Sequence, residues 1–145
     1  MRIKEVLAGK SVQDVVTVKP DATVRELLGL LAEHNIGALV VSADGASVDG
    51  IVSERDVVRR LNSDEEVLDS EVSSIMSTEV ATCEGHQTVN ELMQLMTERR
   101  FRHVPVVDGD RLTGIVSIGD VVASRMSELQ FERDQLDSYV HSAQT

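Results

Sequence analysis

The sequence Gly50-Ile51-Val52-Ser53-Glu54-Arg55-Asp56 returns later in the chain as Gly114-Ile115-Val116-Ser117-Ile118-Gly119-Asp120, identical at Gly, Ile, Val, Ser and Asp. In each copy a short apolar run ends at the serine, and the aspartate follows three residues later, where helix-forming sequence begins. This pattern predicts a strand, a tight turn and the first turn of a helix.

Two interpretations of the repeated serine and aspartate remain open at this point. In a capping box, the serine hydroxyl accepts from a backbone N–H of the first helical turn and the acid reaches back to the serine N–H, so no ligand is needed. Alternatively, the free N–H groups and positive dipole end of such a helix suit a phosphate, and the carboxylate could accept from ribose hydroxyls.

The composition narrows the class of protein. The chain has 145 residues, of which 41% are hydrophobic, so it can bury a core of single-domain size. The net charge of -11 and an aromatic content of 2% argue against binding of duplex or single-stranded nucleic acid. No leader and no apolar run long enough for a membrane span are evident, so we expect a cytoplasmic protein.

Metal and catalytic signatures are not evident. Cys83 is the single cysteine and is expected in the core, and the four histidines share no metal-ligand spacing. No Gly-x-Gly-x-x-Gly, Walker loop or Ser/His/Asp order is present. The paired carboxylates lie on separate, equivalent repeats, which indicates two binding sites and argues against an enzyme.

The order of elements is predicted to occur twice. The first set comprises a short helix over 1–9, a strand over 15–18, a helix over 23–34, strands over 37–41 and 48–52, and a helix to about 61. An offset of 65 then matches Val15 to Val80, Thr17 to Thr82 and Thr23 to Thr88. Each unit therefore has the order strand-helix-strand-strand-helix, and we expect the two to pack about a pseudo-twofold axis.

The expected boundaries are a first repeat over 1–62, an acidic, solvated connector over 63–72, a second repeat over 73–125 and a helical extension over 126–145. The extension carries apolar residues at spacings close to a heptad, which predicts one long terminal helix. Such a helix could fold back on its own chain or meet a second chain, and we favour the second possibility.

This tandem organisation resembles the CBS-domain pair, or Bateman module, over roughly Lys4 to Arg125. The resemblance depends on the paired Gly-Ile-Val-Ser-x-x-Asp segments and on the buried strands within 35–41 and 101–107. It implies an α/β fold of two CBS repeats with a long C-terminal helix. It also implies homodimers with four repeats in a disc, and binding of AMP, ADP, ATP, NAD or S-adenosylmethionine in clefts between the repeats.

The resemblance also implies roles for individual residues, in which Ser or Thr contacts phosphate, Asp holds ribose and the first strand of the partner repeat contacts the base. One site would contain Ser53 and Asp56 with Ala81, Thr82, Arg102 and His103. The other would contain Ser117 and Asp120 with Val16, Thr17, Gly37 and Ala38.

The two expected sites differ in charge. Arg55, Arg102 and His103 accompany the first site, whereas the corresponding positions of the second are Gly119, Gly37 and Ala38. Because guanidinium groups bind phosphate in a planar, bidentate manner, we expect tighter binding of phosphorylated ligands at the Asp56 site. The leading hypothesis is a ligand sensor that signals to an unknown effector protein. The alternative is a structural or adaptor homodimer with unoccupied clefts.

Overall fold

Each copy of the repeated motif completes a three-stranded sheet in the computed structural model, which describes residues 1–10 and 15–143. The first unit consists of β1 (Thr17–Val18), α2 (Val24–His34), β2 (Ala38–Val41), β3 (Gly50–Ser53) and α3 (Glu54–Leu61). The second consists of β4 (Cys83–Glu84), α4 (Val89–Arg99), β5 (His103–Asp108), β6 (Arg111–Ser117) and α5 (Ile118–Ala143). The predicted order of strands and helices is confirmed in both units.

The two sheets have the same topology. In the first, β1 is parallel to β2 and β2 is antiparallel to β3, and the second sheet repeats this with β4, β5 and β6. The register places Ala38 opposite Ser53 in one unit and His103 opposite Ser117 in the other. The first residue of each middle strand therefore lies beside the serine of the repeated motif.

The helix after the first strand begins at the predicted cap in each unit. Thr23 Oγ1 accepts from the Glu26 N–H at 3.1 Å, and the Glu26 carboxylate accepts from the Thr23 N–H, which completes a capping box. Thr88 caps α4 with one of these two bonds, since its Oγ1 accepts from the Glu91 N–H at 3.1 Å. Both helices end on a residue with left-handed backbone, Asn35 (φ 51°) and Arg100 (φ 57°).

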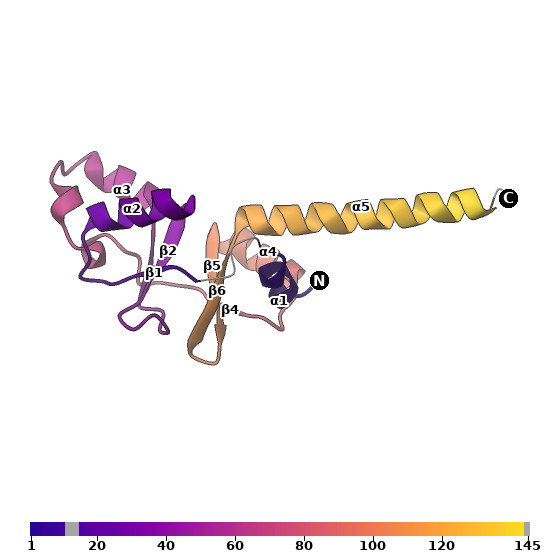
Figure 1. The fold of residues 1–145 in the computed structure, drawn as a ribbon, viewed down its shortest axis with the longest axis horizontal. Coiled ribbons are helices and arrows are strands. Elements are labelled where there is room, and N and C mark those ends of the chain that lie inside the picture. The colour runs from indigo at the N-terminus through magenta and orange to yellow at the C-terminus, as the bar shows by residue number, and fades with distance from the viewer. Residues whose placement is uncertain (11–14, 144–145) are drawn as a thin grey trace.

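Each unit has its own apolar core between its sheet and its helices. In the first, Leu39 and Val41 of β2 pack with α2 and α3, while Ala38 and Val40 on the other face of that strand are also buried. On that other face Ala38 lines a cavity together with Phe101 and His103 of the second unit. The two sheets accordingly lie in the middle of the body, with α2 and α3 at one end (Figure 1).

The segments that precede the two units are exchanged between them. Helix α1 (Ile3–Ala8) packs in the second core, where the Ile3 N–H donates to the Gln87 carbonyl at 2.9 Å. The short helices η1 (Val67–Asp69) and η2 (Val72–Ser74) pack in the first core, where the Val72 N–H donates to the Ala22 carbonyl at 2.8 Å. The prediction of a solvated connector is wrong for Val67 and Val72, which are fully buried.

Helix α5 leaves the body and projects well beyond it (Figure 1). Its first turns contact α1, α4 and β6, and the Met1 amino group forms an ion pair with Glu128 at 3.3 Å. The alternative in which this helix folds back on its own chain is therefore wrong for the described residues. No helix in the described part of the chain combines the length and apolar character needed to cross a membrane.

Candidate functional site

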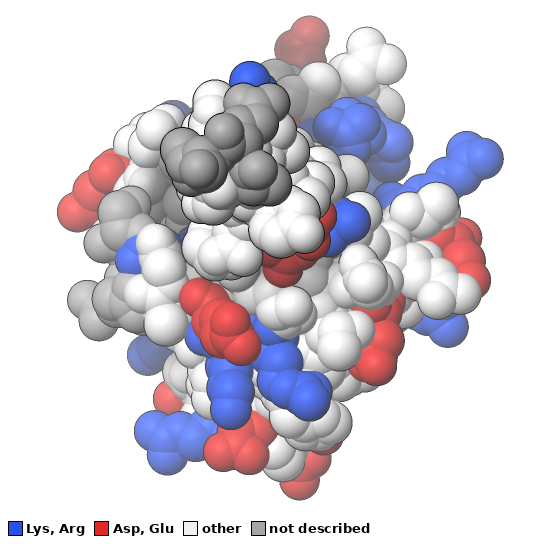
Figure 2. Space-filling view, turned by 90° about the vertical axis from the view of Figure 1, so that its right-hand side faces the viewer, with Lys and Arg blue, Asp and Glu red and all other residues white. Residues whose placement is uncertain are grey.

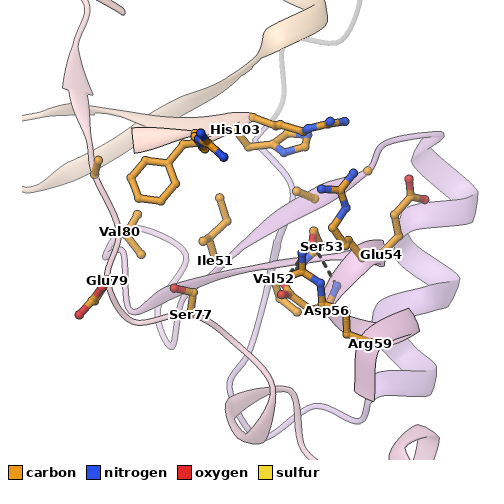
Figure 3. A pocket seen from close by; sticks show the side chains of 17 residues that line it. Ile51, Val52, Ser53, Glu54, Asp56, Arg59, Ser77, Glu79, Val80 and His103 are labelled. Atoms are coloured by element: carbon orange, nitrogen blue, oxygen red, sulfur yellow. Dashed lines mark hydrogen bonds between the residues drawn. The ribbon is translucent and has the colours of Figure 1, made fainter. Parts of the chain in front are cut away.

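A cavity of about 370 Å³ lies between the two units, at the corner where β3 leads into α3. Its walls come from that corner, from the segment that leads into β4, and from the residues between α4 and β5. The volume falls within the usual range for small-molecule sites. Figure 3 shows Ser53, Asp56 and Arg59 on one wall and His103 on the opposite wall.

The Ser53 and Asp56 side chains form the capping box of α3. Asp56 Oδ2 accepts from the Ser53 N–H at 2.8 Å and from the Ser53 hydroxyl at 3.0 Å, and the Asp56 N–H approaches Ser53 Oγ at 3.3 Å. Within the described residues the other oxygen, Oδ1, has no hydrogen-bond partner. The corner therefore offers an unused carboxylate oxygen and the N-terminus of a helix to the same cavity.

Most residues predicted for the first site line this cavity, namely Ser53, Arg55, Asp56, Ala81, Arg102 and His103. Thr82, which was predicted with them, is exposed and does not line it. Gly37 and Ala38, which were assigned to the second site, line the first cavity instead. The register accounts for this difference, because Ala38 pairs with Ser53 and the Gly37 carbonyl accepts from the Glu54 N–H at 3.0 Å.

The second motif has the same corner with a different partner. Asp120 Oδ2 accepts from the Ser117 N–H at 2.8 Å, and the Asp120 N–H donates to Ser117 Oγ at 3.1 Å. In addition, Lys10 Nζ forms an ion pair with Asp120 Oδ2 at 3.0 Å and donates to the Ile115 carbonyl at 2.9 Å. The carboxylate equivalent to Asp56 is therefore already neutralised from within the chain.

Electrostatics at Asp120 reflect this ion pair. Burial acts to raise the pKa of the carboxyl, but the Ser117 N–H and the Lys10 ammonium together hold it below its ordinary value. Val16 and Thr17, predicted for the same site, lie in the first unit: Val16 packs against its core and Thr17 lines a separate surface hollow with Lys19 and Glu26.

His103 lies between the two corners. Burial lowers the pKa of its imidazole, the nearby Asp120 and Glu54 carboxylates oppose that shift, and Lys10 and Arg102 add to it. A Cβ atom on Gly37 would lie 3.8 Å from His103 Nε2 and 3.6 Å from Glu54 Oε1, so this glycine leaves room for both side chains. The imidazole is therefore placed to respond to charge at either corner.

Four further cavity residues were not singled out from the sequence as site residues. Arg59 lies one helical turn beyond Arg55 on α3, a spacing that places both on the same face. Arg100 and Phe101 belong to the basic stretch 99–102 at the C-terminus of α4, a position that suits the helix dipole and would also suit an anion. Glu79 occupies the position before β4 that Lys10 occupies before β1. Only comparison of the two exchanged segments would have drawn attention to it.

Other chemistry is not indicated in the described residues. No group of three or more His, Cys, Asp and Glu side chains among them could hold a metal ion. Cys83 is buried in the second core, as predicted, and burial raises the pKa of its thiol to about 11.

On the face of the molecule where α5 ends, Lys and Arg side chains are interspersed with Asp and Glu (Figure 2).

Comparison with known proteins identifies the tandem organisation. The family model described as CBS domain matches residues 3–63 and again 72–127. The CBS domain-containing protein YhcV of Bacillus subtilis is 34% identical over 113 residues, which cover 78% of this chain and 80% of that protein. A crystal structure of the CBS-domain containing protein ATU1752 from Agrobacterium tumefaciens has a TM-score of 0.80 and 45% identity, and covers 86% of this chain and 99% of that one.

A more distant structure shares the fold and holds ligands. The CBS domain pair of protein MJ0100, solved in complex with 5-methylthioadenosine and S-adenosyl-L-methionine, has a TM-score of 0.77 and 22% identity. The alignment covers 88% of this chain and 98% of that chain. At 22% identity, the similarity to this structure shows a shared fold and nothing further.

Proposed function

The chain belongs to the CBS-domain family and carries two CBS domains in tandem, and on this premise we propose that it binds an adenosyl ligand in the cavity at Ser53 and Asp56. In this role the α3 N-terminus receives a phosphate or another electron-rich group, and Asp56 accepts from the ribose hydroxyls. Segment 79–81 and Phe101, on the opposite side of the cavity, surround the base.

The observation that carries this proposal is the unused Oδ1 atom of Asp56. A capping acid needs one oxygen for the fold, and here Oδ2 alone fulfils that requirement. The residue also lines a cavity of suitable volume beside a helix N-terminus, where the second oxygen can accept from a ligand. A related fold, the MJ0100 pair, binds two adenosyl compounds, which supports the same chemical class for this chain.

The cavity is bounded by both units, so its ligand would act on their relative packing. A ligand that contacts α3 on one side and β5 on the other stabilises the arrangement in which both walls are in place. We propose that this shift in packing is transmitted to an effector protein and that the module performs no catalysis itself.

The two corners are expected to bind unequally. Asp120 is already paired with Lys10, whereas Glu79, at the equivalent position of the first corner, carries the charge of the opposite sign. The Asp56 site should therefore be the tighter of the two for a phosphorylated ligand. Isothermal titration calorimetry with AMP should show a loss of the tight phase in Arg102→Ala and its retention in Asp120→Ala. Loss in Asp120→Ala alone would reverse the assignment.

A thermal-shift series with AMP, ADP, ATP, NAD and S-adenosylmethionine tests the proposal as a whole. A ligand present at about 100 times its dissociation constant adds roughly 2.7 kcal/mol to the free energy of unfolding. At least one compound of the series should produce a clear upward shift in Tm. No shift with any of them would favour the alternative of an adaptor whose clefts stay empty.

A further inference from the structure

Four arginine side chains line the cavity, and in the described structure none of their guanidinium groups has an ion-pair or hydrogen-bond partner. They are Arg55, Arg59, Arg100 and Arg102. Some arginines outside the cavity do have partners: Arg25 pairs with Asp69 at 3.3 Å, and Arg60 donates to the Ser74 carbonyl at 3.0 Å. Among the described residues seven guanidinium groups lack such a partner, and four of these seven line one cavity of a protein whose net charge is -11.

From this we propose that the cavity selects a nucleotide with two or more phosphates, an adenosine di- or triphosphate, over AMP or S-adenosylmethionine. The inference rests on the proposed function, since it specifies the ligand of the same site. Arginine is the side chain best suited to phosphate, because its planar fork donates two parallel hydrogen bonds. S-adenosylmethionine brings a sulfonium cation in place of phosphates and would leave these groups unpaired.

The spacing of the arginines favours a chain of phosphates over a single one. Arg55 lies in the first turn of α3, and Arg59 lies four residues later on the same face, about 6 Å further along the helix axis. Arg100 and Arg102 belong to the opposite wall, in the second unit. A phosphate at the α3 N-terminus accounts for Arg55 and Arg102, whereas Arg59 and Arg100 need an anion that extends away from that corner.

The backbone of Arg100 is a separate argument for a functional role. Its φ of 57° lies in the left-handed region, which Asn adopts more readily than Arg. The equivalent position of the first unit, which does not line this cavity, is Asn35 (φ 51°). The less favourable residue is therefore found in the copy that lines the cavity, where its charge can contact a ligand.

Calorimetry with the full chain, in EDTA and at fixed ionic strength, tests the inference with AMP, ADP, ATP and S-adenosylmethionine. We expect ATP to bind at least tenfold more tightly than AMP. Arg59→Ala and Arg100→Asn should each lower the affinity for ATP by about tenfold, the low end for a hydrogen bond between charged groups, because both side chains are partly solvated. Their affinity for AMP should change by less than about twofold.

Two controls separate this role from a structural one. Arg111→Ala removes an exposed arginine at the start of β6, outside the cavity, and should change neither affinity. Arg100→Asn should leave the free energy of unfolding unchanged or raise it, since Asn tolerates the left-handed backbone better. A loss of ATP affinity without a loss of stability would support a role in binding.

The possible failures are distinguishable. Equal affinities for AMP and ATP in the wild-type protein, or tighter binding of S-adenosylmethionine, would overturn the polyphosphate inference and leave the adenosyl site in place. Equal losses of AMP and ATP affinity in Arg59→Ala and Arg100→Asn would also overturn it. Failure of all four compounds to bind would overturn the proposed function and this inference with it.

Discussion

Asp56 serves the fold with one carboxylate oxygen and leaves the other open to the cavity. The two interpretations of the motif, helix cap and ligand contact, are therefore compatible at this residue. Asp120 presents the same cap, but its Oδ2 atom also receives the Lys10 ammonium. We therefore expect the two identical motifs to differ in ligand binding because of one residue from a distant part of the sequence.

Asp56→Ala should weaken both folding and ligand binding. Loss of the cap costs about 1 kcal/mol of unfolding free energy. Loss of a hydrogen bond to a charged group should also lower nucleotide affinity by roughly 10- to 150-fold.

Glu26→Ala is the matched control, because Glu26 holds the equivalent position in the capping box of α2, outside the cavity. Urea unfolding and calorimetry should show that Glu26→Ala affects stability alone; an unchanged affinity in Asp56→Ala would exclude its role in binding.

His103 should make the stability of the protein depend on pH. Since burial lowers the pKa of its imidazole, the unfolded chain takes up this proton at a higher pH than the folded protein does. The contribution is fully present above the unfolded pKa of about 6.5 and is lost as pH falls through the folded pKa. Urea unfolding between pH 8 and 5 should show a decline below about 6.5 that His103→Gln reduces and His141→Gln does not. A decline of equal size in His103→Gln would refute this.

The sequence predicted the residues at the corner of the first site but not those that surround it. Ser53, Asp56 and Arg102 could be named because the motif and its repeat are local patterns. Arg59 and Phe101 could not, because their position at the cavity depends on how the two units pack. The Lys10 ion pair was also out of reach, since 110 residues separate its two members.

At the scale of elements, the exchange of segments explains why two glycines are needed at equivalent places. A Cβ atom on Gly50 would lie 2.7 Å from Met76 Sδ and 2.9 Å from the Ser77 carbonyl oxygen. A Cβ atom on Gly114 would lie 2.8 Å from Leu7 Cδ2. In each unit the last strand therefore carries, three residues before the serine of the motif, a glycine that admits the segment preceding the other unit.

Gly50→Ala should destabilise the protein by about 1–3 kcal/mol, the usual cost of overpacking, because the Ser77 carbonyl is backbone and cannot rotate away. Gly29→Ala provides the opposite control. Gly29 lies within α2 with no atom within 4 Å of its added methyl group, so the change should stabilise by up to about 1 kcal/mol. Denaturant unfolding of both variants measures these effects. A neutral Gly50→Ala would show that the strand and segment 76–77 are not in close contact.

The strands and helices were predictable because hydrophobic periodicity and caps are local signals and because the second copy repeated the first. The capping box at Thr23 and the buried strand over 37–41 are examples that the structure confirms. The burial of Val67 and Val72 was not predictable, because the few apolar residues of this acidic segment follow neither a helical nor a strand period. Their burial depends on the exchange of segments, which leaves no periodic pattern in the sequence.

At the scale of the whole molecule, α5 is the feature that a single chain does not explain. It has 26 residues and projects from the body with several large apolar side chains at least half exposed, among them Val122, Met126, Leu136 and Tyr139. A helix surrounded by solvent gains little stability by itself, because most helical stability in proteins comes from packing of an apolar face. We expect an exposed apolar stripe of this length to be covered by another chain.

We therefore expect the protein to be a homodimer in which α5 contributes to the interface. Leu129→Glu combined with Leu136→Glu should convert it to a monomer, because both residues lie on the apolar stripe, seven positions apart, and burial of the new carboxylates would be costly. Neither side chain is buried within the chain, so the monomer should remain folded and should still bind nucleotide.

Ser127→Glu combined with Ser138→Glu adds the same charge on other faces of the same helix and should preserve the dimer. Sedimentation equilibrium over a range of concentrations measures the outcome. A wild-type protein that is monomeric throughout, or equal dissociation in both double variants, would show that the stripe on α5 does not mediate self-association.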